Sequence, residues 1–443
     1  MCFGARATPE HDGEHRDGDR DLHRWWRVSL GAVIALAVLI RLPSLASTRW
    51  LYFDDGVYNA SVLAMRRGGL PFRDVFSSQG PVFLPTLWFA DLVGLHAARA
   101  ARLAMVGSGV LMTVSTYLIA RRVAPRGAAL GAGALVALSG TALLAAGPIE
   151  ADGLALALGT LALALAATPS RPSMARAATV GVVLGAALGV KSLYVLPAVV
   201  TVGWLMIPKD RRDRIVVIIL AAAVTGLVVS LPWGLANVWD DYVAFQLAIP
   251  RRRDPADNLS LVTTTLLRLD RLVVAVVVLA VLTVVVRRVR GRGIAPPPHR
   301  LAPTDRVLTL APVVWFVASA VVVIVLSEVN DGFLRYVAFL VPPLAVLAAR
   351  SRPPLLVAAL VVAVLLPSHL GALGEDVRVR RPSTLEAQAI RDLQDLARGK
   401  QVLSDEPGLA WSAGLAVPPN LVDPSYNRMA AGYLTSEEVR AET

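Results

Sequence analysis

Cysteine is almost absent from this chain, since Cys2 is the only one in 443 residues. A single thiol excludes an intrachain disulfide and a cysteine metal site, and it leaves the redox compartment undetermined. The sequence also lacks a His-Glu-x-x-His zinc motif, a Walker phosphate loop and a complete Gly-x-Gly-x-x-Gly motif. Its six histidines have no ligand spacing. The sequence therefore indicates no metal and no nucleotide cofactor.

Charged residues are also scarce, at 17% of the chain, whereas 55% of the residues are hydrophobic and the mean hydropathy is +0.58. These values exclude an ordinary soluble domain and indicate a polytopic membrane protein. The net charge of +11 is compatible with nucleic-acid binding, but Lys and Arg occur in short clusters between apolar stretches. Such clusters follow the positive-inside rule, so the charge reports topology and no nucleic-acid partner is expected.

Apolar stretches that approach the length of a membrane-spanning helix occur eleven times. They are residues 28–45, 100–120, 128–147, 152–168, 177–190, 192–207, 214–232, 271–287, 307–327, 334–349 and 354–370. The first is expected to be an uncleaved helix rather than a signal peptide, because a long polar region precedes it. The stretches on either side of Lys191 are short, and one long kinked element is the alternative. Val82–His96 is too short to span and is predicted to be an interfacial or re-entrant helix.

Alternate threading of these spans places six clusters of Lys and Arg on one side, which the positive-inside rule identifies as the cytoplasm. The clusters contain Arg24, Arg27, Arg121, Arg122, Arg126, Arg171, Arg176, Lys209, Arg211, Arg212, Arg214, Arg287, Arg288, Arg290, Arg292, Arg350 and Arg352. The outer side holds residues 46–99, 147–152, 191, 233–268, 328–333 and the tail after 371. Arg251–Arg253 is then an outer cluster that breaks the rule. We expect a multi-pass plasma-membrane protein with a cytoplasmic N-terminus.

Composition divides the chain into three parts. Residues 1–24 are rich in Asp, Arg, His and Gly and are predicted to be a disordered cytoplasmic head. Residues 25–370 form the transmembrane domain, with interfacial helices in the outer loop 46–99. Residues 371–443 are polar, with helix character at 383–397 and strand character at 400–405. The predicted fold class is an all-α polytopic membrane protein with a small C-terminal α/β domain on the outer face.

Two acidic pairs lie on the predicted outer side. Asp54 and Asp55 are adjacent in the first outer loop, where their repulsion and desolvation near a membrane require a reason. General-base chemistry is one reason, and capping of the helix that follows is the alternative. Glu150 and Asp152 follow the third span. Carboxylates from two loops could bind an acceptor hydroxyl and take its proton, whereas capping by Asp152 is again the alternative.

Several basic residues share the outer side with these acids. They are Arg41, Arg73, Lys191, Arg251–Arg253 and Arg335. Each alone is explained by snorkelling or by contact with a lipid headgroup. As a set, they would stabilise a phosphate or pyrophosphate leaving group, which favours an anionic lipid-linked substrate.

The order and spacing of six segments carry a family resemblance. They are Asp54-Asp55, the run Gly-Gly-x-x-Phe-Arg-Asp-x-Phe-x-x-Gln-Gly-Pro at 68–81, the span 102–122, Ile149–Asp152, Gly185–Lys191, and Arg335-Tyr336 leading to Pro342-Pro343. Together they resemble the GT-C glycosyltransferases of the protein O-mannosyltransferase and lipid A aminoarabinose transferase type, the bacterial glycosyltransferase family 39-like group. The resemblance covers most of residues 28–350 and implies that 25–370 is a GT-C catalytic domain with about eleven spans.

The resemblance also implies roles for particular residues. Asp54 and Asp55 stand where the family has an Asp-Glu pair that supplies the catalytic base, and Asp55 departs from the usual Glu. Asp152 resembles the second acidic site, with Glu150 beside it, and Lys191 resembles a lysine at an outer turn. The residues expected to bind the donor phosphate are Lys191, Arg335, Arg73 and Arg41. Tyr58, Gln79 and Pro81 are expected to support the loop. Gln79 stands where relatives often carry Lys or His, so a direct cationic contact to phosphate is not expected at this position.

The activity that the resemblance implies is transfer of a hexose or pentose from a polyprenyl-phosphate donor, with inversion. The acceptor is a hydroxyl of a cell-envelope glycan, lipid or protein on the outer face. No cofactor is required, and a divalent cation is compatible with the site but not indicated. The tail after 371 looks like a shortened outer domain of bacterial relatives.

A polytopic secondary transporter and a lipid-linked polymer ligase are the alternatives. A transporter is expected to place ionisable residues at the bilayer midplane in broken helices, whereas the acids here lie at the ends of spans. A ligase on a similar scaffold would lack the Asp-Asp loop.

Overall fold

The computed structural model describes residues 28–95, 99–250, 254–291, 303–327, 334–374 and 378–442. The predicted disordered head 1–24, the outer cluster Arg251–Arg253 and the loop 328–333 lie outside the described residues. Within the described ranges the chain is helical and contains no strand, only two isolated bridges. The prediction of an all-α polytopic membrane protein is confirmed.

Each of the eleven predicted apolar stretches is helical. The helices are Val28–Ala46, whose last turn is α2 (Leu42–Ala46), α5 (Leu103–Val123), α6 (Arg126–Leu138) with α7 (Gly140–Ala146), α8 (Ala151–Ala166), α9 (Met174–Leu188), α10 (Ser192–Leu205), α11 (Asp213–Ser230), α15 (Arg271–Val289), α16 (Pro303–Ala320), η6 (Leu334–Leu340) with α17 (Val341–Ser351), and α18 (Leu355–Leu373).

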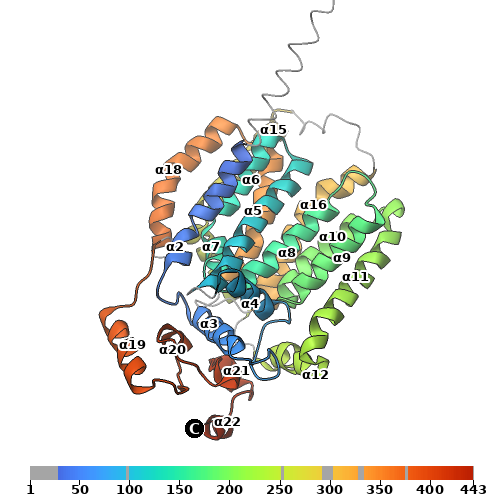
Figure 1. The fold of residues 1–443 in the computed structure, drawn as a ribbon. Coiled ribbons are helices and arrows are strands. Elements are labelled where there is room, and N and C mark those ends of the chain that lie inside the picture. Colours follow the sequence, from blue (N-terminus) through green and yellow to red (C-terminus); the bar gives the residue numbers. More distant parts are fainter. Residues whose placement is uncertain are drawn as a thin grey trace, which may run out of the picture.

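By length and hydropathy, seven helices in the described residues can cross a membrane, or eight if the pair α6 and α7 counts as one span. The helices α8, α9 and α10 are apolar but have only 16, 15 and 14 residues. The total of eleven therefore stays a prediction. The chain turns at Lys191 between α9 and α10, which both pack against α8 (Figure 1). The structure thus has two helices here, not one kinked element.

The pair α6 and α7 differs from the single helix predicted over 128–147, because the axis bends by 60° at Ser139. The backbone of Ser139 is extended, and its hydroxyl accepts a hydrogen bond from the Ala142 amide at 3.0 Å. This side chain ends one helix and caps the next. A Cβ at Gly140 would collide with the carbonyl of Leu269, so the close approach of a second helix requires glycine there.

Small residues allow close packing of α9 against α11. A Cβ at Gly181 or Gly185 would overlap the backbone carbonyls of Ile218 and Ala222 in α11.

The short helices gather at one end of the bundle, which is the lower end in Figure 1. They include α3 (Phe53–Arg66), α4 (Phe83–Val93), α12 (Leu235–Val238), α19 (Thr384–Leu396), α20 (Pro407–Ser412), α21 (Tyr426–Ala430) and α22 (Ser436–Ala441). Two more short helices are α13 (Phe245–Ala248), which follows α12 in the chain, and α14 (Pro255–Leu269), which packs against α7 and η6. The first outer loop and the C-terminal segment therefore share this end. It is called the site end below.

The predicted α/β character of residues 371–443 is not confirmed. Over 378–442 the only β pairing is an isolated bridge between Gln401 and Ala416. The predicted strand at 400–405 does not extend, because the Glu406 amide donates to the Ser404 hydroxyl in a turn and Pro407 begins a helix. On the other side of the bridge, prolines 418 and 419 lack the amide that a ladder requires.

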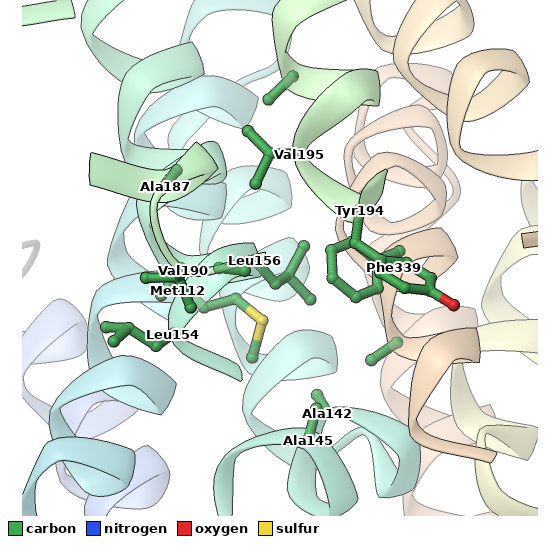
Figure 2. Close-up of a cluster of buried hydrophobic side chains, with 14 of the residues drawn as sticks. Met112, Ala142, Ala145, Leu154, Leu156, Ala187, Val190, Tyr194, Val195 and Phe339 are labelled. Carbon is green, nitrogen blue, oxygen red and sulfur yellow. The ribbon is translucent and has the colours of Figure 1, made fainter. Parts of the chain in front are cut away.

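A continuous apolar core runs beneath the site end, built from α5, α7, α8, α9, α10 and η6. Figure 2 shows part of it, with Met112 and Val190 on one side of Leu156 and the rings of Tyr194 and Phe339 on the other. The rings of Tyr194 and Phe339 have centroids 5.0 Å apart. Val190 and Tyr194 flank Lys191, so the core fixes the turn that carries this lysine.

Candidate active site

Asp55 is fully buried in an ion pair with Arg102. The Arg102 guanidinium donates to both carboxylate oxygens, at 3.2 and 2.5 Å, and neither side chain is exposed. The carboxylate also accepts hydrogen bonds from the amides of Leu51 and Ile149, each at 2.9 Å. These contacts join the first outer loop to the turn before α8. Asp55 therefore has no open side for a substrate.

Asp54 is the more accessible member of the pair. It lies in the first turn of α3, and its side chain is 29% exposed. Its carboxylate pairs with the Arg335 guanidinium at 2.5 Å. Neither aspartate is the N-cap of α3, because that position belongs to Tyr52. Although they are neighbours in sequence, the two carboxylates thus have different partners and different access to solvent.

Arg335 is the centre of a cluster that joins the two acidic loops. Besides Asp54, it pairs with Glu150 at 3.1 Å and with Asp152 at 3.0 Å. Asp152 also pairs with Lys191 at 2.9 Å. The structure therefore brings together Asp54, Glu150, Asp152, Lys191 and Arg335, which are five of the residues that the sequence singles out.

The charges of this cluster do not balance when all of its acids are ionised. Three carboxylates face two cations, and the side chains of Glu150 and Asp152 are 2% and 0% exposed. Burial raises the pKa of Glu150 well above its ordinary value; Arg335 opposes this shift, and Asp54 and Asp152 add to it. A proton on Glu150 would make the cluster neutral. Asp54 would then be the carboxylate left with access to the surface.

Lys191 lies between two aromatic rings. Its ammonium is 5.1 Å from the ring centroid of Tyr194 and 4.7 Å from that of Tyr336, and its Nζ lies 3.5 Å from the Tyr336 hydroxyl. Burial lowers the pKa of Lys191, but Asp152 and Tyr336 together more than offset this effect, and the pKa lies above its ordinary value. The lysine is therefore held as a cation, with 14% of its side chain exposed.

The residues predicted to support the loop lie next to this cluster. Tyr58 is buried and packs edge-on against Phe83 with centroids 4.8 Å apart. The loop at Gln79 and Pro81 docks on the turn that precedes Lys191. This docking uses hydrogen bonds from the Gly80 and Val82 amides to the carbonyls of Val190 and Gly189, at 3.0 and 2.8 Å.

Two predicted phosphate-binding residues are not brought into the cluster. Arg41 is fully buried, donates to the Ala37 carbonyl at 3.0 Å and packs against Gly109, where a Cβ would overlap the guanidinium. Arg73 points to solvent with 69% of its side chain exposed, and it pairs with Asp74 at 3.9 Å. Gly109 provides the space that the Arg41 side chain fills. Arg73 follows Phe72, whose φ of 63° forms a tight turn that directs Arg73 outward.

Arg102 is the partner of Asp55 that the residue-level predictions from the sequence missed. Arg102 precedes α5 on the outer side, so its departure from the positive-inside rule was a usable signal. Asp423 accepts a hydrogen bond from the Ser425 amide at 3.0 Å, two residues further along the chain. Burial, followed by Asp54, Glu150 and Asp423, raises the pKa of Tyr58. The C-terminal segment thus places a further carboxylate near the cluster.

Comparisons with known proteins bear on this arrangement. No protein-family model matches the sequence, and no curated protein matches it either. Solved structures do match. ArnT from Cupriavidus metallidurans bound to undecaprenyl phosphate has a TM-score of 0.59 at 17% identity, over 88% of this chain and 85% of that one. This chain has the GT-C fold.

The oligosaccharyltransferase from Archaeoglobus fulgidus has the same fold. Its complex with zinc and sulfate has a TM-score of 0.57 at 13% identity, over 90% of this chain and 58% of that one. Its complex, as AglB, with an inhibitory peptide and a dolichol-phosphate has a TM-score of 0.53 at 13% identity, over 85% of this chain and 58% of that one. The GT-C chain described here therefore spans less than two thirds of the oligosaccharyltransferase but most of ArnT. Its multi-pass membrane character agrees with these neighbours.

Proposed function

We propose that this GT-C protein transfers a sugar from a polyprenyl-phosphate donor to an acceptor hydroxyl at the outer face of the membrane, with inversion. One observation carries the proposal: Asp54 is the partly exposed carboxylate of a cluster that also holds the cations Arg335 and Lys191. A base and cations in one place are what acceptor activation and departure of a phosphate require.

In the proposed reaction, the Asp54 carboxylate takes the proton of the acceptor hydroxyl. The acceptor oxygen then forms a bond to the anomeric carbon of the sugar. The bond from that carbon to the phosphate oxygen breaks, and its electron pair leaves with the lipid phosphate. Attack from the face opposite the phosphate inverts the configuration.

The cations have two tasks in this scheme. Arg335 orients Asp54 through the 2.5 Å ion pair. Arg335 and Lys191 also offset the negative charge that grows on the departing phosphate. Glu150 and Asp152 hold the two cations in place, and Asp55 with Arg102 anchors the loop that presents Asp54.

The arginines at the opposite ends of the spans support our proposal that the site faces outward. There Arg171 pairs with Asp213, Arg211 donates to the Thr168 carbonyl at 3.0 Å, and Arg287 donates to the Ser351 carbonyl at 3.1 Å. The predicted cytoplasmic arginines thus meet at one end, and the acidic loops meet at the other. The positive-inside rule assigns the acidic end to the outer face.

The neighbours support a lipid-phosphate donor. ArnT has been solved with undecaprenyl phosphate and AglB with a dolichol-phosphate. This chain covers a larger share of ArnT than of the oligosaccharyltransferase, which favours a donor like that of ArnT over an oligosaccharide donor. We further propose that residues 25–370 form the catalytic domain and that the acceptor is a component of the cell envelope.

Purified protein in nanodiscs, supplied with radiolabelled polyprenyl-phosphate sugars and a cell-envelope extract, tests the proposal. Asp54→Asn is expected to reduce transfer by about 10²–10⁴-fold, the usual contribution of a general base. Asp395→Asn is the control, because Asp395 is an exposed aspartate of α19, paired with Arg398, that lies apart from the cluster. Full transfer by the Asp54 variant would refute the role of this residue. Solute flux without any lipid-linked sugar would favour the transporter alternative.

A further inference from the structure

A short segment after α11 contacts both loops that flank the candidate site. It consists of the π-helix η4 (Trp239–Ala244) and α13, and it follows α12 at the site end (Figure 1). Three of its side chains, Asp241, Tyr242 and Gln246, form hydrogen bonds with the backbone of residues 77–78, 188 and 192. These three side chains are called the clamp. Single π-helical turns frequently occur at functional sites.

Tyr242 bridges the two helix ends on either side of Lys191. Its hydroxyl donates to the carbonyl of Leu188, the last residue of α9, at 2.7 Å. The same oxygen accepts a hydrogen bond at 2.5 Å from the amide of Ser192, the first residue of α10. The N-cap of α10 is Lys191 itself, which supplies no capping hydrogen bond. Tyr242 therefore satisfies an amide that the helix leaves open.

The other two clamp residues hold the loop that carries Gln79. Asp241 accepts a hydrogen bond from the Ser77 amide at 3.4 Å, and Gln246 donates to the Ser78 carbonyl at 3.0 Å. The loop then passes so close to Tyr242 that a Cβ at Gly80 would lie 3.1 Å from the phenol ring. The loop is thus packed between the clamp and the turn at residues 189–190.

We propose that Tyr242 is a positioning residue for Lys191, and that the clamp sets the placement of this lysine relative to the donor phosphate. The inference rests on the proposed function for the identity of that ligand. The geometry behind it does not: Tyr242 fixes the backbone on both sides of Lys191, whose Nζ must reach Asp152 while it stays between two rings. Without the Tyr242 hydroxyl, the Leu188 carbonyl and the Ser192 amide lose a partner, and the turn loosens.

Lysine labelling tests the placement without any substrate. The chain has three lysines, Lys191, Lys209 and Lys400, so an amine-reactive reagent and mass spectrometry can follow each one. In Tyr242→Phe, we expect the labelling rate of Lys191 to rise at least about threefold relative to Lys400, which is exposed. Tyr117→Phe is the matched control, because it removes the hydroxyl of a buried tyrosine of α5. Unchanged Lys191 labelling in Tyr242→Phe would overturn the inference.

Kinetics then separates positioning from a general structural role. Tyr242→Phe is expected to raise the KM for the lipid donor about tenfold and also to lower kcat, because Lys191 offsets charge on the phosphate as it departs. A purely structural role would lower the yield and melting temperature at constant KM, and that result would overturn the inference. If Tyr242→Phe does not fold, Gln246→Ala is labelled in its place. Faster labelling of Lys191 in Gln246→Ala would support the role of the clamp, and unchanged labelling would overturn the inference. Faster labelling together with absence of any transferase activity would refute only the proposed function.

Discussion

The buried pair of Asp55 and Arg102 leads to a prediction that separates the two adjacent aspartates. Replacing Arg102 with methionine leaves the Asp55 carboxylate buried without its cation. It also removes hydrogen bonds of 2.9–3.0 Å to the carbonyls of Ser44, Ser47 and Arg49. Loss of one partner of such a pair costs about 3–5 kcal/mol. We expect the free energy of unfolding to fall by this amount in Arg102→Met.

Asp55→Asn should destabilise the protein comparably, and the double variant should cost less than the sum of the two. The difference, expected to be about 1–3 kcal/mol, measures the coupling between the side chains. In contrast, Asp54→Asn should change stability by no more than about 1 kcal/mol, because the Asp54 side chain is 29% exposed and meets one cation shared by three acids.

The assay is denaturant unfolding in mixed micelles, followed by the fluorescence of the nine tryptophans. Transfer activity per folded molecule is measured in parallel. An Asp55→Asn variant that is as stable as the wild type but inactive would contradict this prediction, because Asp55 would then act on the substrate. An Asp54→Asn variant that unfolds easily would also contradict it.

Two further predictions concern the contacts of the C-terminal segment and of the clamp. Gly56→Ala should lower the free energy of unfolding by about 1–3 kcal/mol through overpacking, because the new Cβ would lie 2.7 Å from the Gly408 amide nitrogen. Faster proteolysis of residues 378–442 would show that this contact has loosened. Unchanged proteolysis would contradict the prediction. Burial raises the pKa of Asp241 from 3.8 to about 6, so ionisation there is less favourable in the folded state. The contribution of protonated Asp241 to stability should be full below about pH 4 and lost as the pH rises through 6. Asp241→Asn should remove this part of the pH dependence of the melting temperature. An identical pH profile in the wild type and the variant would contradict the prediction.

The helices of this protein could be predicted from sequence because a membrane-spanning helix needs a local property, a run of apolar residues. All eleven predicted stretches are helical for this reason. The bend at Ser139 could not be predicted in the same way. It depends on the close approach of Leu269 to Gly140, which is a contact between residues far apart in the chain.

The candidate site was partly predictable. Acids and cations at the ends of spans on one side must lie at the same membrane face. A single site hypothesis could therefore include Asp54, Glu150, Asp152, Lys191 and Arg335. Which of two adjacent aspartates is buried depends on its partner. Asp55 finds Arg102, 47 positions away, and no local pattern specifies that pairing. For the same reason Arg41 and Arg73 looked equivalent to Lys191 although they lie elsewhere.

The boundary predicted at residue 371 separates two compositions but not two structural units. Arg380 donates to the Leu51 carbonyl at 3.0 Å, and its own carbonyl accepts from the Thr48 amide at 2.8 Å. The Leu51 amide in turn binds the Asp55 carboxylate, which Arg102 holds from inside the bundle. The loop that presents the candidate base is therefore braced from two sides, and one brace comes from beyond the last span. Residues after 371 thus belong to the framework of the site, although every member of the central ionic cluster lies before them.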